Sequence, residues 1–175
     1  MKDLLNLLAT RRSIRKYTED PISEEALNSI LRAGLLSPSG CNYRPWEFIV
    51  VRDKEMLTKL SYARTGSANM LKQADCAIVV LGDTNKSTVW CEDCSIAMAQ
   101  MHLMAHSLGL GSCWIQIRLR TAQTEESSDG YLRQLLSYPE NLSALAILSL
   151  GVPAENRPAH DIPQLPDEKV HFEKY

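Results

Sequence analysis

The chain has 175 residues, of which 45% are hydrophobic and 23% charged, and its formal net charge is -2 at pH 7. These values are typical of one globular domain, residues 1–175, that closes a single hydrophobic core. The small negative charge argues against binding to nucleic acid or to an anionic membrane, and no apolar run reaches the roughly 18 residues that a membrane span needs. The N-terminus lacks a signal-peptide pattern. The five cysteines lie in apolar segments rather than in a spaced framework, which favours a reduced, cytoplasmic protein.

Helices and buried strands alternate along the predicted chain. Helices are expected to end near Thr10, to start at the N-cap Ser23, to cover Asp53–Leu71 with an interruption near Gly66, and to span Thr88–Leu108 and Ser128–Ser137. Near-continuous apolar runs predict buried strands at Trp46–Val51, Cys76–Leu81, Ser112–Ile117 and Ala144–Leu150. Strands separated by helices indicate an α/β or α+β sandwich with helices covering the sheet.

The C-terminal tail, Gly151–Tyr175, is unusual for a compact domain. It contains four prolines and cannot pack as a helix. We therefore expect it to lie against another subunit, with Val170–Phe172 as an added strand.

The segment Arg11–Tyr17 carries the first cluster of residues suited to a ligand. If the chain becomes extended where the first helix ends, residues two apart lie on the same side. Arg11, Ser13 and Arg15 would then converge as two guanidinium groups with a hydroxyl between them. Guanidinium groups bind phosphate oxygens bidentately and keep their charge, so this pattern suits a phosphate. The alternative is a solvated basic face that offsets the negative end of the helix dipole.

A second candidate is the loop Ser37–Trp46, which leads into the first predicted strand. Two prolines and a glycine fix its shape while leaving backbone groups accessible, and Ser39 and Asn42 add polar side chains. Loops held by a rigid strand often bind ligands, whereas a plain turn is the alternative.

Together these two segments resemble the signature of the nitroreductase family. That signature is an Arg-Arg-Ser-x-Arg stretch closing the first helix, followed at matching separation by a Pro-Ser-x-x-Asn-x-Gln-Pro-Trp loop. Two later stretches, Ala105–Ile115 and Leu148–Ala154, also match, so the resemblance spans essentially the whole chain. It implies an α+β sandwich whose mixed, mostly antiparallel sheet is flanked by helices, with the C-terminal tail extending onto a partner subunit.

The resemblance also implies FMN as the cofactor and a homodimer as the working form. The residues that would hold the phosphate and ribityl chain are Arg11, Arg12, Ser13 and Arg15. The loop along the isoalloxazine ring would consist of Pro38, Ser39, Gly40 and Asn42. One subunit would offer this loop to flavin bound mainly by the other subunit. Ile115 and Gln116 resemble the strand segment that approaches the ring from the other side.

The sequence departs from the family pattern at three places. Arg44 stands where the family usually has Gln, which brings an extra cation close to the flavin or its entrance. Gln116 stands where Gly is frequent, which would narrow the pocket or add a hydrogen bond. The tail lacks the arginine that many relatives offer to the phosphate, and either Arg157 or His160 would substitute for it.

The resemblance implies an enzyme that reduces FMN with NADH or NADPH and then reduces a nitroaromatic, quinone or similar small acceptor by a ping-pong cycle. Flavin accepts hydride at N5, so the protein positions and polarises it, and no catalytic acid or base is assigned. Two alternatives stay open. One is another flavin reaction on the same scaffold, such as ene reduction, dehalogenation or flavin fragmentation; the other is a non-enzymatic FMN-binding protein.

Two other motifs carry weaker hypotheses. Cys91, Cys94, His102 and His106 imitate a zinc-ligand set, but all four are predicted on one helix. Cys94 and His102 would be about 12 Å apart at about 1.5 Å per residue, whereas zinc holds its ligands at roughly 2.0 to 2.3 Å, so no metal site is predicted. Gly109-Leu110-Gly111 precedes a strand, the reverse of the Rossmann order, so NAD(P)H is expected to share the flavin cleft.

Overall fold

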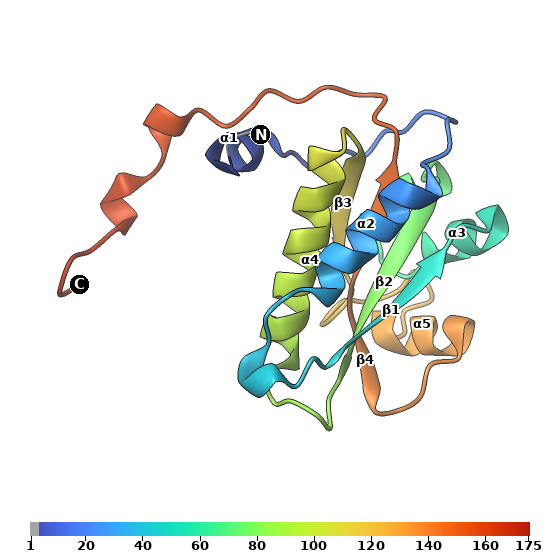
Figure 1. Cartoon of the computed structure of the whole chain (residues 1–175). Helices are drawn as coiled ribbons and strands as arrows, with labels where there is room; N and C mark the ends of the chain where they lie inside the picture. Colours follow the sequence, from blue (N-terminus) through green and yellow to red (C-terminus); the bar gives the residue numbers. More distant parts are fainter. Residues whose placement is uncertain (1–3) are drawn as a thin grey trace.

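The computed structural model describes residues 4–175, and its centre is a four-stranded sheet with the strand order β1-β2-β4-β3 (Figure 1). The strands are β1 (Trp46–Val51), β2 (Cys76–Asp83), β3 (Gly111–Gln116) and β4 (Leu142–Gly151). All neighbouring strands pair antiparallel, and the parallel contact is an isolated bridge between Ser13 and Ser112. The predicted α+β class is thereby confirmed, and the four-stranded sheet is antiparallel throughout.

Helices cover both faces of this sheet. They are α1 (Leu4–Thr10), α2 (Glu24–Leu35), α3 (Lys54–Leu60), α4 (Trp90–Ser107) and α5 (Ser128–Leu136). In Figure 1, α2 and α4 lie on one face and α3 and α5 on the other. Successive residues of β2 follow this division, since Ile78 and Val80 pack with α2 and α4, whereas Ala77 and Val79 pack with α3 and α5. The buried apolar runs in the sequence are therefore strands with a core on each side.

The segment that was expected to be helical from Asp53 to Leu71 is broken as predicted. Asp53 caps α3 by accepting a hydrogen bond from the backbone N–H of Met56 at 2.8 Å. The helix ends at Leu60, and a turn through Gly66, whose φ is +75°, leads to a short 3-10 helix, Asn69–Lys72. Gly66 adopts this left-handed conformation without the strain that a side chain would add.

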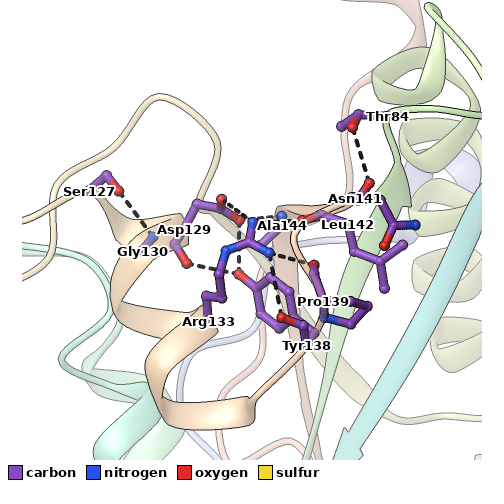
Figure 2. Close-up of polar contacts among 10 residues, drawn as sticks. All are labelled: Thr84, Ser127, Asp129, Gly130, Arg133, Tyr138, Pro139, Asn141, Leu142 and Ala144. Carbon is purple, nitrogen blue, oxygen red and sulfur yellow. Dashed lines mark hydrogen bonds and ion pairs between the residues drawn. The ribbon is translucent and has the colours of Figure 1, made fainter.

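A polar cluster fastens α5 to the start of β4 (Figure 2). One carboxylate oxygen of Asp129 accepts hydrogen bonds from the Ala144 N–H at 2.6 Å and from the Tyr138 hydroxyl at 2.8 Å. Arg133 pairs with the other carboxylate oxygen at 3.0 Å and donates to the Leu142 carbonyl at 2.7 Å. The burial of Tyr138 and its contact with this carboxylate raise the pKa of its hydroxyl, so the cluster stays a fixed structural brace.

The N-terminal segment after α1 lies across one end of the sheet. Ile14 donates its N–H to the Ser112 carbonyl at 2.9 Å, and Thr18 donates to the Val152 carbonyl at 2.9 Å. Gly111 and Gly151 face each other across β3 and β4 directly beneath this segment. A Cβ at Gly111 would lie 2.8 Å from the Ile14 side chain, so this close approach depends on glycine. The sheet thus fixes the backbone that carries the predicted arginines.

The tail after β4 runs past α1 and away from the sheet (Figure 1). His160 donates its N–H to the Ala9 carbonyl at 2.8 Å, and beyond it residues 161–175 are exposed. They include two 3-10 helices, Ile162–Gln164 and Asp167–Lys169, and Val170–Phe172 is not a strand in the single chain. That this segment packs on a partner subunit stays a prediction. No helix within residues 4–175 is long and apolar enough to cross a membrane.

Candidate functional site

The extended segment Arg11–Arg15 separates its side chains onto two sides, as its sequence predicts. Arg11, Ser13 and Arg15 gather around the buried Cys113 of β3. Burial raises the pKa of the Cys113 thiol, while the guanidinium group of Arg15, a hydrogen bond with Ser13 and the charge of Arg11 oppose the rise. Arg12 lies on the other side, in a small cavity of about 190 Å³ that residues of the tail help to line. Two cations and a hydroxyl therefore share one side.

Arg15 lines a polar cavity of about 300 Å³ at the edge of β3. The residues around it are Arg15, Arg64, Gly66, Ser67, Asn69, Met70, Cys113 and Trp114. No carboxylate is among these lining residues of the described chain. Arg64 makes no hydrogen bond or ion pair with any residue in 4–175, and the guanidinium of Arg15 makes only a 3.4 Å contact with the Ser13 carbonyl. Two uncompensated guanidinium groups at one cavity are suited to an anionic ligand.

Trp114 connects this polar cavity to an apolar one of about 430 Å³. The second cavity is lined by Leu8, Arg11, Ile96, Ala99, Gln100, His102, Leu103 and Trp114. The Trp114 indole N–H donates to Oε1 of Gln116 at 2.9 Å, and Nε2 of Gln116 donates to the Arg118 carbonyl at 3.1 Å. Gln116 thus fixes the orientation of the indole between the two cavities. Ile115 points to the opposite face and is buried in the core, so only its backbone is available to a ligand.

Arg11 is held by a buried histidine of α4. Its Nη1 atom lies 2.8 Å from Nε2 of His102, whose Nδ1 atom contacts the Ser112 hydroxyl. His102 is 7% exposed. Burial, together with the nearby charges of Arg11 and His106, lowers the pKa of its imidazole to about 4. His102 is therefore neutral at pH 7.

A carboxylate of the tail contacts the same segment from behind. Oε1 of Glu155 accepts the Arg15 N–H at 2.6 Å, and Oε2 pairs with Arg157 at 3.0 Å. These hydrogen bonds lower the pKa of Glu155, so it is ionised at neutral pH. Arg157 is thereby engaged by Glu155, and Arg12 donates to the Pro158 carbonyl. His160 contacts α1 through its backbone N–H, which donates to the Ala9 carbonyl. In the single chain, Arg12 and Arg157 both hold the tail.

The predicted loop lies at the other end of α4. Gly40 donates its N–H to the buried carboxylate of Asp93 at 2.8 Å, near the start of the helix, whereas Arg11 contacts His102 near its end. Nine residues of helix separate the two contacts, about 13 Å. Pro38, Ser39, Gly40 and Asn42 are therefore not brought together with the arginines within one chain (Figure 1).

Arg44 is folded back on this loop. Its N–H donates to the Ser39 hydroxyl at 2.9 Å, and its Nε atom donates to the Asn42 side-chain oxygen at 2.9 Å. Cys41, Asn42 and Arg44 have φ values of 49°, 57° and 48°. Because three residues with side chains adopt the left-handed region here, the loop has a specific, strained shape rather than that of a plain turn.

Comparisons with known proteins identify the family of this chain. The model of the nitroreductase family matches residues 8–63 and 57–152. The chain belongs to the nitroreductase family. A solved FMN-dependent nitroreductase of Clostridium difficile R20291 is 45% identical, with 98% of this chain and 100% of that chain covered and a TM-score of 0.95.

The names of two further relatives mention FMN, and the first also gives NAD(P)H as the electron donor. An FMN reductase [NAD(P)H] of Bacillus subtilis is 29% identical over 197 residues, which cover 100% of this chain and 75% of that protein. A solved complex with FMN from Desulfovibrio desulfuricans is 29% identical, with 100% of this chain and 99% of that chain covered and a TM-score of 0.79.

The sequence did not predict several residues that line the polar cavity of this nitroreductase-family protein. Arg64, Ser67 and Asn69 reach the cavity because the chain turns at Gly66 between α3 and the 3-10 helix. The cluster of polar residues around a glycine, just before a buried strand, is the signal that could have indicated them.

The four Cys and His residues that imitate metal ligands do lie on one helix, α4. Cys94 is buried against the Leu81 carbonyl, while His102 and His106 face the N-terminal segment. Among residues 4–175, no three His, Cys, Asp or Glu side chains gather as a metal site requires.

Proposed function

We propose that this chain, as a single domain over residues 1–175, binds FMN and transfers electrons from NADH or NADPH to nitroaromatics, quinones or similar small acceptors by a ping-pong cycle. FMN-dependent oxidoreductase activity with NAD(P)H is what the names of its relatives indicate. The cytoplasm is the proposed location, because all five cysteines are free thiols.

The observation that carries the proposal is the pair of uncompensated cations at the polar cavity. Arg15 is exposed and Arg64 half-buried, and no carboxylate among the lining residues balances their charge, so an anionic ligand can supply the counter-charge. Arg15 and Arg64 point toward one such space, and Ser13 and Arg11 lie beside it along the same side of the chain. This donor set fits the phosphate and polar edges of FMN.

Each residue has a defined task in this proposal. Arg11, Ser13 and Arg15 would bind the phosphate and ribityl chain, while Trp114 and Met70 would cover the ring and exclude water. Arg12 and Arg157 would bind the phosphate only after giving up their present partners. These are the Pro158 carbonyl for Arg12 and the Glu155 carboxylate for Arg157. Bound FMN would supply hydride acceptance at N5. Guanidinium groups close to the ring would favour the reduced, anionic form of the cofactor.

The proposed active form is a homodimer in which the loop Pro38–Asn42 of one chain completes the site of the other. The loop lies too far from Arg11–Arg15 to serve the same ligand within one chain, yet its strained shape indicates a specific task. Exposed apolar residues on α1 and the tail, such as Leu5, Leu8 and Phe172, offer further surface for such contacts. Ile115, through its backbone, and Gln116, through the indole that it holds, would border the ring from their own chain.

The first test is an absorption spectrum of the purified protein, followed by anaerobic addition of NADH, then of NADPH, and then of a quinone or nitroaromatic. A flavin spectrum that bleaches with a nicotinamide donor and recovers with the acceptor is the expected result. Bound flavin that never bleaches would instead support the non-enzymatic alternative. Protein that takes up no FMN from excess solution would refute the proposal.

The cavity itself is tested by removing its cations. We expect Arg15→Ala and Arg64→Ala each to weaken FMN binding by about tenfold, the effect of losing one charge-assisted contact. Arg120→Ala is a matched control, because among the described residues the side chain of this exposed arginine hydrogen-bonds only to the carbonyl of its neighbour Leu119. Equal FMN affinity in all three variants, measured by fluorescence titration, would show that the cofactor binds elsewhere.

A further inference from the structure

Two histidines one turn apart on α4 hold the start of the arginine segment. His106 Nε2 lies 2.9 Å from the Thr10 hydroxyl, and His102 Nε2 lies 2.8 Å from Nη1 of Arg11. This is the His-x-x-x-His pair that imitates metal ligands in the sequence. Its spacing places both rings on one face of the helix, toward the segment Thr10–Arg11.

The neighbours of His102 fix its protonation. A guanidinium group can only donate hydrogen bonds, so the Nε2 atom that it contacts must be the acceptor. The proton of the neutral ring then lies on Nδ1 and is donated to the Ser112 hydroxyl. The charged or titratable groups facing the ring are Arg11, from the N-terminal segment, and His106, from its own helix. Both favour the neutral ring.

Ser112 links this histidine to the candidate phosphate site. Its carbonyl accepts the Ile14 N–H at 2.9 Å, and Ser112 pairs with Ser13 in the parallel bridge. His102 therefore contacts the site twice, through the Arg11 side chain and through the strand residue that holds the Ser13 backbone. The Arg11 side chain, being long and flexible, would otherwise lose considerable rotamer freedom on binding an anion.

We infer that His102 is a positioning residue that fixes the Arg11 guanidinium for a phosphate group. One nitrogen of the fork is engaged by the imidazole, which leaves the remaining N–H groups oriented for phosphate oxygens. The inference rests on the proposed function, because the phosphate is that of FMN. It adds a role for a buried residue that acts through the Arg11 side chain.

The test compares two flavins that differ only in the phosphate. Dissociation constants for FMN and riboflavin are measured with the full-length protein and with its His102→Leu and His102→Gln variants. We expect H102L to weaken FMN binding about tenfold while riboflavin binding changes less than about twofold. H102Q, whose amide oxygen can accept from Arg11 and whose amide nitrogen can donate to Ser112, should restore most of the FMN affinity.

Two further variants separate positioning from general stability. His106→Leu removes the adjacent contact with Thr10 and should leave the ratio of FMN to riboflavin affinity unchanged. In an Arg11→Ala background, H102L should have no further effect on that ratio, because the group that it positions is gone.

Two outcomes would overturn the inference while leaving the proposed function intact. One is an unchanged ratio of FMN to riboflavin affinity in H102L, as when both affinities fall equally. The other is an undiminished effect of H102L on that ratio in the R11A background. Wild-type protein that binds neither flavin would instead refute the proposed function, so the two failures are distinguishable.

Discussion

At the scale of single residues, the burial of His102 makes the stability of the fold depend on pH. The pKa of His102 is about 4 in the folded protein and 6.5 in the unfolded chain. As pH falls below 6.5, the unfolded chain takes up a proton that the folded protein does not, so stability is present above 6.5 and is lost toward pH 4. From this group alone, the free energy of unfolding should fall by about 2 kcal/mol between pH 7.5 and pH 5.

Urea unfolding of the flavin-free protein at the two pH values measures this loss. His102→Gln is the control, because glutamine keeps both hydrogen bonds and does not titrate. The free energy of unfolding of the wild type, minus that of the variant, should fall by about 2 kcal/mol between pH 7.5 and pH 5. Parallel pH dependence in both proteins would mean that the imidazole is not held neutral.

At the scale of elements, the arginine segment depends on the close approach of its backbone to the end of β3. Gly111→Ala would place a methyl group 2.8 Å from the Ile14 side chain, which should destabilise the fold by about 1–3 kcal/mol and release FMN more readily. Thermal unfolding and flavin retention are the measurements. In the double variant G111A/I14A the 2.8 Å contact with Cγ2 of Ile14 is removed and the 3.0 Å contact with the Cβ at position 14 remains, so the loss of stability should be smaller than the sum of the two single losses. Strict additivity would show that Gly111 is needed for another reason.

The regular elements could be predicted because their causes are local. The strand Trp46–Val51 has the predicted bounds, since an apolar run follows Pro45 directly. Ser23 caps α2 by accepting the Ala26 N–H at 3.1 Å, as its residue type indicates. The alternation of Arg11, Ser13 and Arg15 onto one side is also local, because it follows from an extended backbone.

The rest of the site depends on contacts that no periodicity reveals. Arg64 reaches the cavity through a turn at Gly66, and the φ of +75° there is set by the folded structure. The contact between Arg11 and His102 joins residues 91 positions apart. Trp114 and Gln116 are two residues apart on a predicted strand and so share a face, but the hydrogen bond between their side chains depends on the conformations that the folded structure sets.

At the scale of the whole molecule, the distance between loop and arginines predicts complementation between subunits. A variant with Arg11→Ala and Arg15→Ala and another with Ser39→Ala and Asn42→Ala should each bind FMN poorly. When they are unfolded together and refolded, half of the dimers are mixed, and each mixed dimer has one intact site of two. About a quarter of the wild-type flavin content should therefore return. If the mixture binds no more FMN than its components, each chain completes its own site.

The position of the arginine segment also sets an order of events during synthesis. Arg15 receives its Glu155 contact from 140 residues further along, and Thr18 pairs with Val152 after the last strand. A nascent chain that has emerged only as far as β3 contains every arginine of the segment. It does not yet contain the end of β4 and the start of the tail, which hold that segment in place. Cofactor capture must therefore wait until nearly the entire polypeptide has left the ribosome, since such distant contacts form late. Prematurely terminated chains would release no flavin-loaded fragments, and the bound cofactor would mark completed molecules alone.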